Sequence, residues 1–396
     1  GESAKTRADA EKYFKSYQNA IDAIGKASSG QTHITSPGIS IKLSALHPRY
    51  EFAKRERVLN ELAPLLLTLA KAAKAYNIGF TIDAEEADRL ELSLDIIEKV
   101  FSDPALDGWE GFGLAVQSYQ KRAPFVIDWL ADLAKKNKRR LMVRLIKGAY
   151  WDSEIKWSQL LGLESYPVFT RKNSTDVSFI ACAKKLLAQP DYFYPQFGTH
   201  NAWSVAAIIE LAGDRRDFEF QCLHGMGQTL YDRVVGQNNF NIPCRIYAPV
   251  GTHKDLLGYL VRRLLENGAN SSFVNAIGND QIPVEKIVTN PIARTAALTS
   301  KPHPHIPLPK DLFGHERINS LGVDSSNMQT PEQLKTKMDA LQKKQWQSGP
   351  IINGKLLTHS PEQPITSPAN REHLVGKTHD ATTDDVENAL AETWNA

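Results

Sequence analysis

The sequence predicts an α/β fold of the (βα)8 TIM-barrel class, distorted, with its first strand expected upstream of residue 1 and with a C-terminal extension. Two observations predict it. Seven short apolar runs alternate with helical segments between residues 39 and 267, which is the pattern of a parallel sheet whose strands are joined by helices. Polar residues also follow each run at its C-terminal end, the face on which barrel enzymes place their sites.

The order of elements follows from apolar periodicity and from glycine and proline breaks. Strands are expected at 39–46, 79–86, 113–119, 141–149, 194–199, 218–223 and 245–248. Helices are expected at 1–30, 53–76, 89–101, 123–136, 177–187, 205–212, 229–235 and 254–267, with a long insertion at 150–175. The glycine pairs near 111 and 225 are only GxG, so a dinucleotide fingerprint of the Rossmann type is unsupported.

Composition changes after the barrel pattern ends. Residues 1–290 form the predicted barrel, and 291–330 read as a proline-rich linker, because KPHPHIPLP at 301–309 holds four prolines. Residues 331–396 begin with a short helix and continue as short strands, with a second helix at 383–394.

Charge and cysteine usage exclude several classes of protein. The formal net charge is only +2 and no basic block is present, which argues against nucleic-acid binding. The three cysteines are dispersed in apolar contexts, so neither a disulfide framework nor a CxxC metal site fits, and a reducing compartment is expected. No apolar run approaches the 18 or so residues of a membrane span, so any membrane contact is expected to be peripheral.

The stretch LMVRLIKGAYW at 141–151 places two cations, Arg144 and Lys147, in a strand that reads as sheet core. An apolar interior does not tolerate such charges without anionic partners. Either the strand end reaches solvent or protein carboxylates there, or the two cations meet an anionic ligand.

The last helix of the barrel pattern, 254–267, places Tyr259, Arg262, Arg263 and Glu266 on one face. Leucines at 257, 260, 264 and 265 are expected to face the core. One interpretation is a solvated polar face with a weak intrahelical pair. The other is a pair of guanidinium groups over the barrel mouth, which suits a carboxylate ligand.

Two further constellations are open to more than one interpretation. Lys42 lies inside its predicted strand and Asp83 at the end of the next one, and the two are expected to pair. The pair is either structural, or its lysine is a Schiff-base lysine or a paired cation in a substrate pocket. A metal site built from His47, His200, His224, Asp83 and Glu85 is disfavoured, because no HxH, HExxH or CxxC spacing is present. No metal is therefore predicted.

Seven long segments together resemble the proline dehydrogenase domain of the bacterial bifunctional proline utilisation flavoenzymes. The segments are SIKLSALHPRY (40–50), DAEEADRLELSLD (83–95), QSYQKR (117–122), RLIKGAYWDSEIK (144–156), FGTHN (197–201), FEFQCLHGMG (218–227) and RIYAPVGTHKDLLGYLVRRLLENGANSSFVN (245–275). The resemblance covers roughly residues 1–320, and the tail, with SPAN at 367–370, is similar to the start of the aldehyde dehydrogenase half of those enzymes.

The resemblance implies a distorted barrel that binds FAD and transfers a hydride from C5 of L-proline to flavin N5, giving Δ1-pyrroline-5-carboxylate. It implies a catalytic role for Lys42, Asp83 and Arg144. The residues that it places at the substrate are Tyr247, Tyr259, Arg262, Arg263 and Glu266. Those that it places at FAD are Gln117, Arg144, Lys147, Gly148, Trp151, Thr170, Lys172, Thr199, His200 and Asn201.

The same resemblance implies a membrane quinone as electron acceptor, and a cytoplasmic protein peripherally associated with the inner membrane. The competing hypotheses are a lysine-dependent aldolase barrel, a metal-dependent hydrolase barrel, and a scaffold that only packs against the second domain.

Overall fold

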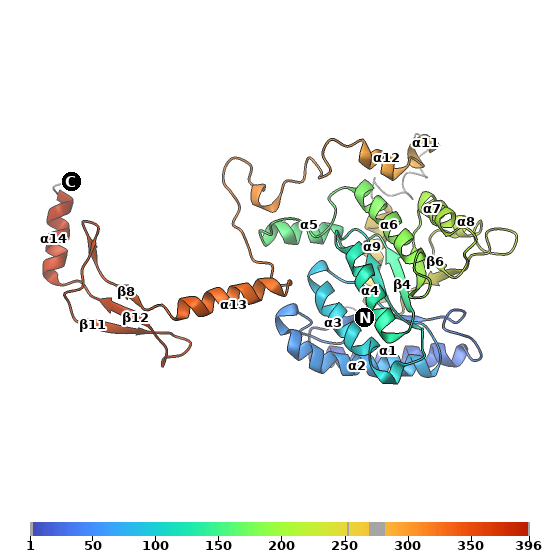
Figure 1. Cartoon of the computed structure of the whole chain (residues 1–396), viewed down its shortest axis with the longest axis horizontal. Helices are drawn as coiled ribbons and strands as arrows, with labels where there is room; N and C mark the ends of the chain where they lie inside the picture. Colours follow the sequence, from blue (N-terminus) through green and yellow to red (C-terminus); the bar gives the residue numbers. More distant parts are fainter. Residues whose placement is uncertain (1–2, 252, 269–281, 395–396) are drawn as a thin grey trace. The chain divides into compact units, whose positions relative to one another are not determined.

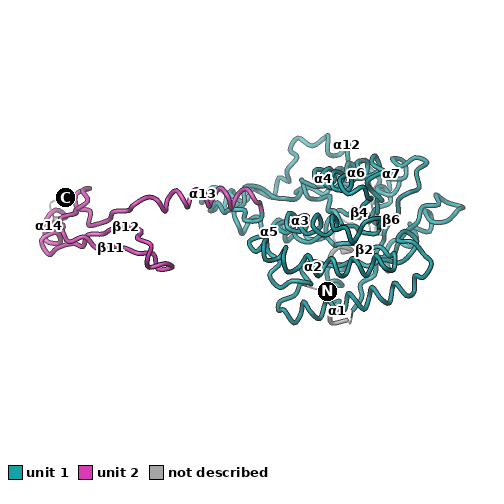
Figure 2. Tube along the Cα trace, turned by 60° about the horizontal axis from the view of Figure 1, so that its bottom comes forward, with its two compact units in different colours: residues 1–326 teal, residues 327–396 magenta. Residues whose placement is uncertain are grey.

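The structure is a computed structural model that describes residues 3–251, 253–268 and 282–394. The chain divides into two compact units, residues 1–326 and 327–396 (Figure 2). The first unit contains the predicted barrel pattern.

The first unit is built on a seven-stranded sheet in which every neighbouring pair is parallel and the spatial order follows the chain. Its strands are β1 (Ile39–Ile41), β2 (Phe80–Ile82), β3 (Phe112–Gln117), β4 (Leu141–Ile146), β5 (Phe193–Gly198), β6 (Glu219–Leu223) and β7 (Cys244–Tyr247). Each predicted strand is present, which confirms the TIM-like α/β class.

The sheet curls, so that its two edge strands approach each other. Arg245 of β7 donates hydrogen bonds to the backbone carbonyls of Ile34, at 2.7 Å, and Ser36, just before β1. Its guanidinium also binds both carboxylate oxygens of buried Glu219, at 2.8 and 2.9 Å. The seven strands therefore form a half-barrel with a polar interior.

Helices surround the sheet, as Figure 1 shows for α2, α3, α4, α6 and α7. The helices of the described part of this unit are α1 (Arg7–Ala27), α2 (Arg55–Ala75), α3 (Leu90–Phe101), α4 (Ala123–Asn137), α5 (Trp151–Leu160), α6 (Lys172–Leu187), α7 (Ala202–Ala212), α8 (Gln228–Tyr231), α9 (His253–Gly268), α11 (Val284–Ile287) and α12 (Pro291–Ala296). The core between sheet and helices is rich in phenylalanine: Phe80, Phe101, Phe112, Phe197 and Phe220 are fully buried. Burial of such aromatic side chains supplies the main stabilisation of the sheet-helix interface.

The strands β1 and β2 are shorter than predicted. Each ends one residue before a charged side chain, Lys42 after β1 and Asp83 after β2. After Lys42 the chain turns through a 3₁₀ helix, Leu43–Ala45, rather than continuing the strand. The charged residues consequently lie at the end of the half-barrel and not inside the sheet.

The predicted insertion at 150–175 was wrong in part, because it contains helix α5, and α6 begins at Lys172 rather than at residue 177. The short segment α8 also ends at Tyr231, earlier than the predicted helix.

The described residues of the second unit form two small sheets and two helices. Its elements are α13 (Gln329–Gln342), β8 (Trp346–Ser348), β9 (Ile351–Ile352), β10 (Lys355–Leu356), β11 (Glu362–Thr366), β12 (Leu374–His379) and α14 (Thr383–Trp394). Strand β12 lies between β11, to which it is antiparallel, and β8, to which it is parallel. The predicted helix at 383–394 is confirmed.

None of the helices formed by the described residues is long and apolar enough to cross a membrane.

Candidate functional site

A cavity of about 690 Å³ opens at the C-terminal ends of the half-barrel strands. Most of the side chains singled out from the sequence line it. They are Lys42, Asp83, Arg144, Lys147, Gly148, Trp151, Thr170, Lys172, Thr199, His200, Asn201, Tyr247, Tyr259, Arg262 and Arg263. Parallel strands deliver their C-terminal residues to one rim, and this topology gathers residues far apart in sequence. The side chain of Glu266 lies outside the described residues.

Arg144, the first cation of β4, connects four strands across the interior. Its Nη1 donates to Asp83 Oδ1 at 2.6 Å and its Nε to Gln221 Oε1 at 2.8 Å, while Nη2 donates to the hydroxyl of Ser40. The guanidinium also lies 4.9 Å from the ring centroid of Tyr247, whose hydroxyl donates to Asp83 Oδ2 at 3.0 Å. Arg144 is therefore an ion-pair partner of Asp83 that the sequence did not predict, and the pairing of Lys42 with Asp83 stays a prediction.

The second cation, Lys147, lies just beyond the end of β4 and pairs with Asp176 of α6 at 2.5 Å. Lys172, one turn earlier on α6, binds the other oxygen of Asp176 at 2.7 Å. Burial opposes ionisation of Asp176, but the two lysines outweigh it and lower the pKa of this carboxyl. Two cations share one carboxylate, so this part of the cavity wall carries excess positive charge.

Protein carboxylates thus meet both cations of LMVRLIKGAYW. Burial, outweighing the attraction of Asp176, lowers the pKa of Lys147, because a desolvated ammonium is less stable. The bound carboxylates do not remove these side chains from the cavity, since Arg144 and Lys147 both line it. They hold the cations in place.

Helix α9 turns its polar face towards the cavity. Tyr259, Arg262 and Arg263 line it, and the guanidinium of Arg263 lies 5.3 Å from the Tyr259 ring centroid. The prediction that the leucines of this helix face the core was wrong for Leu257, Leu260 and Leu264, which are 62%, 47% and 72% exposed. The side chain of Leu265 lies outside the described residues. A helix that lies over a polar cavity places its charged face inward, which is the reverse of ordinary amphipathic packing.

His200 follows β5 and is held as a neutral imidazole. Its Nε2 accepts a hydrogen bond from the backbone N–H of Leu223 at 3.0 Å. Burial, with a further contribution from Arg263, lowers the pKa of His200 to about 4. The ring therefore presents its remaining N–H, at Nδ1, as a donor.

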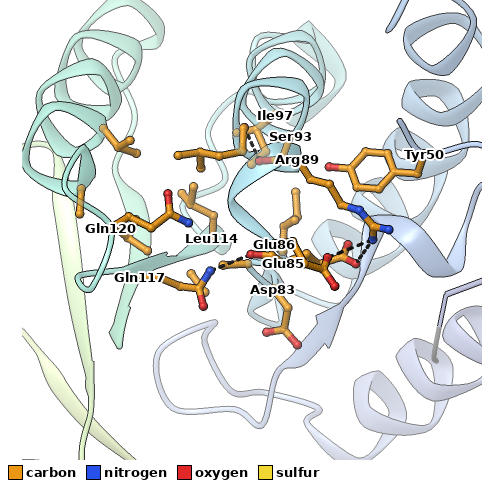
Figure 3. A pocket seen from close by; sticks show the side chains of 17 residues that line it. Tyr50, Asp83, Glu85, Glu86, Arg89, Ser93, Ile97, Leu114, Gln117 and Gln120 are labelled. Carbon is orange, nitrogen blue, oxygen red and sulfur yellow. Dashed lines mark hydrogen bonds and ion pairs between the residues drawn. The ribbon is translucent and has the colours of Figure 1, made fainter. Parts of the chain in front are cut away.

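Gln117 is not among the described residues that line the cavity. Its amide donates to the carbonyl of Glu85 at 2.8 Å and accepts from the N–H of Ala149 at 3.2 Å. Figure 3 shows it beside a smaller pocket, in which Arg89 pairs with Glu85 and Glu86. Gln117 therefore connects that polar pocket to the backbone that follows Gly148.

The residues considered as metal ligands do not form one cluster, although Asp83 and His200 both line the cavity. His47 binds Glu61 at 3.0 Å, and His224 is exposed. Within residues 3–251, 253–268 and 282–394, no cluster of three histidine, cysteine or acidic side chains could hold a metal ion.

Sequence reasoning missed several lining residues, including Tyr119, Tyr150, Gln221 and His303. Tyr150 stands inside the stretch LMVRLIKGAYW, and Gln221 is a polar residue in a buried strand, so both carried a detectable signal. His303 carried none, because its segment has the composition of a linker.

Residues 1–276 match the family described as proline dehydrogenase. The chain is 53% identical to the bifunctional protein PutA of Klebsiella aerogenes and to that of Escherichia coli, over 409 residues in each case. These matches cover all of this chain and 31% of each relative, so the chain spans less than a third of their length. It is also 27% identical to proline dehydrogenase 1 of Bacillus subtilis over 278 residues, covering 69% of this chain and 78% of that protein.

Solved structures agree with these matches. A variant of proline utilization A from Bradyrhizobium japonicum superposes with a TM-score of 0.83 at 54% identity, covering 86% of this chain and 35% of that one. Proline utilization A from Bdellovibrio bacteriovorus, at 24% identity, has the same fold, with a TM-score of 0.86 over 99% of this chain and 41% of that one. Residues 1–276, which match the family, contain the half-barrel and most of the residues that line its cavity. The chain belongs to the proline dehydrogenase family.

Proposed function

We propose that this chain oxidises L-proline to Δ1-pyrroline-5-carboxylate with FAD as its cofactor, as the first step of proline catabolism to glutamate. The observation that carries the proposal is the cavity of about 690 Å³, to which α9 contributes two arginines. Two lysines also line it, Lys147 just after β4 and Lys172 at the start of α6. These charges suit two anionic groups, a substrate carboxylate and a dinucleotide pyrophosphate.

The residues present fit FAD. Lys147 and Lys172 share the single carboxylate of Asp176, and this excess charge suits phosphate oxygens. Gly148 has a φ of +141°, and a Cβ at this position would lie 2.4 Å from the ring of Tyr119, so the backbone there depends on glycine. When bound, FAD supplies the acceptor for the hydride that leaves C5 of proline.

The residues proposed to hold the cofactor surround these anchors. They are Gln117, Arg144, Lys147, Gly148, Trp151, Thr170, Lys172, Thr199, His200 and Asn201. Gln117 does not line the cavity and would act indirectly, by accepting a hydrogen bond from the backbone N–H of Ala149, which does line it. The indole N–H of Trp151 donates to the carbonyl of Phe169 at 2.8 Å, which fixes the ring that lines the cavity.

Arg262 and Arg263 would bind the substrate carboxylate, with Tyr150, Tyr247 and Tyr259 forming the walls. Glu266 is proposed to pair with the arginines or with the amine. The proline amine must lose its proton before hydride leaves C5, because its lone pair forms the C=N bond of the product. The positive charges of Lys42 and the two arginines would favour the neutral amine.

The remaining partners are proposed because the chain belongs to the proline dehydrogenase family and is similar to bifunctional relatives. Electrons would pass to a membrane quinone, with the chain in the cytoplasm and peripherally associated with the inner membrane. Residues 327–396 would be the start of an aldehyde dehydrogenase-like domain. The partner of the half-barrel would then be the aldehyde dehydrogenase half of a longer chain.

Anaerobic addition of L-proline to the purified protein tests the proposed function. We expect a flavin absorbance band that bleaches on proline addition, and bleaching in Arg262→Ala that needs at least tenfold more proline, because a charge-assisted contact is lost. Arg233→Ala, which removes an exposed arginine, is the control. A colourless protein, or a flavin band that proline leaves unchanged, would refute the proposal.

No observation favours the alternative hypotheses of a lysine-dependent aldolase or a metal-dependent hydrolase. The described side chains contain no cluster suited to a metal ion.

A further inference from the structure

The proline-rich segment 301–309, predicted as part of a linker, packs against the first unit, and one of its residues lines the cavity. It belongs to the same compact unit as the half-barrel, and Figure 1 shows the chain after α12 passing from the side of α6 towards α5. His303 of this segment lines the same cavity as Lys147 and Lys172.

Hydrogen bonds anchor the segment to the loop between α5 and α6. The hydroxyl of Tyr166 donates to the carbonyl of Pro307 at 2.6 Å, and Arg171 Nε donates to that of Pro302 at 3.1 Å. Ile306 packs on a small apolar cluster that contains Tyr166. Prolines suit such a segment, because their restricted φ lowers the entropy lost when it docks.

Two contacts hold His303 itself. Its backbone N–H donates to the hydroxyl of Thr170 at 2.9 Å, and its Nδ1 accepts from the backbone N–H of His305 at 3.2 Å. An Nδ1 that accepts a hydrogen bond leaves the ring proton on Nε2. The imidazole thus offers an Nε2–H donor from a position fixed at the cavity wall.

We propose that His303 is a cofactor ligand, which donates from Nε2 to an oxygen of the phosphate–ribose half of the dinucleotide. The inference rests on the proposed use of FAD. It adds to the cofactor site a residue that lies outside the strands and helices of the barrel. Lys147 and Lys172 already make this cavity favourable for phosphate, and Thr170, a predicted cofactor residue, holds the histidine backbone.

Calorimetric titration of the full-length apoprotein with FAD, ADP and riboflavin tests the proposal. We expect His303→Ala to raise the Kd of both FAD and ADP about tenfold, because a hydrogen bond to a charged or polar oxygen is lost. The Kd of riboflavin, which lacks the adenosine diphosphate half, is expected not to change. His303→Gln, which retains an N–H donor, is expected to recover part of the affinity.

His305→Ala is the matched control. It removes an exposed imidazole two residues away but keeps the backbone N–H that binds His303. If His303→Ala fails to fold by circular dichroism, His303→Phe replaces it, since it keeps a planar ring at this position without an N–H donor and is expected to weaken FAD and ADP binding together.

The outcomes separate the two proposals. If the wild-type protein binds FAD and a folded His303→Ala or His303→Phe variant binds FAD and ADP equally well, the role of His303 alone is overturned. A wild-type protein that binds neither FAD nor ADP would overturn the proposed function, and the cofactor role of His303 with it.

Discussion

Arg144 Nη1 and Asp83 Oδ1 meet at 2.6 Å and join β4 to the end of β2 across the interior of the half-barrel. Both side chains are largely buried, at 10% and 16% exposure. Asp83 also accepts from the hydroxyl of Tyr247, so one carboxylate orients two residues of the cavity wall. This relationship gives a first prediction about stability.

Asp83→Ala is expected to lower the free energy of unfolding by about 3 kcal/mol, because it leaves a buried guanidinium without its anion. Asp83→Asn, which keeps the shape and one acceptor, is expected to cost less. Urea denaturation measures both. Glu98→Ala, which breaks an exposed pair with Lys136, is the control and is expected to cost under about 1 kcal/mol. Equal losses in the Asp83 and Glu98 variants would contradict a structural role for the buried pair.

Glu154 of α5 is expected to make stability depend on pH. Its Oε1 accepts from the N–H of Ala87 at 2.7 Å, with Glu86, Asp88 and Arg122 nearby. Burial raises the pKa of Glu154 to about 7. In the unfolded state, Glu154 releases its proton above about pH 4.5, the ordinary pKa of a glutamate side chain. In the folded state, the raised pKa keeps the proton bound until a higher pH.

Stability is therefore expected to fall between about pH 5 and pH 7, with a contribution from Glu154 on the order of 1 kcal/mol per pH unit. Thermal or urea unfolding across this range measures it. Glu154→Gln keeps the shape but cannot ionise, and it should flatten the slope. The same slope in the wild type and in Glu154→Gln would show that other groups cause it.

Gly148→Ala is expected to destabilise the protein and to weaken FAD binding, because the new Cβ would lie 2.4 Å from the ring of Tyr119. Gly236→Ala provides a matched comparison, since Gly236 also has positive φ, at +90°, but a Cβ there meets nothing within 4 Å. It should cost only the conformational strain of about 1 kcal/mol. If the two variants lose equal stability and bind FAD equally well, the contact with Tyr119 has no role.

Lys42→Met is expected to move the acidic limb of the kcat–pH profile about one unit higher, because a nearby positive charge favours the neutral proline amine. Lys71→Met, at an exposed position of α2, should leave the profile unchanged. A profile that does not move in Lys42→Met would remove Lys42 from the deprotonation step.

Much of the fold could be predicted from local sequence. The alternation of apolar strands with helices was readable because strand and helix periodicities differ. The placement of site residues after strands was equally readable, since parallel strands bring their C-terminal ends to one rim. That rule accounts for Lys42, Asp83, His200 and Tyr247, which all line one cavity.

Tertiary structure decided which partners these residues take. The sequence by itself determined that Arg144 and Lys147 need anions, but only the curl of the sheet brings Asp83 to the first, and only the position of α6 brings Asp176 to the second. Likewise, amphipathic periodicity defined the two faces of α9, while the polar cavity beneath it decided which face turns inward. The reason is that an ion pair or a docked helix depends on distances in space, and periodicity along a chain does not contain them.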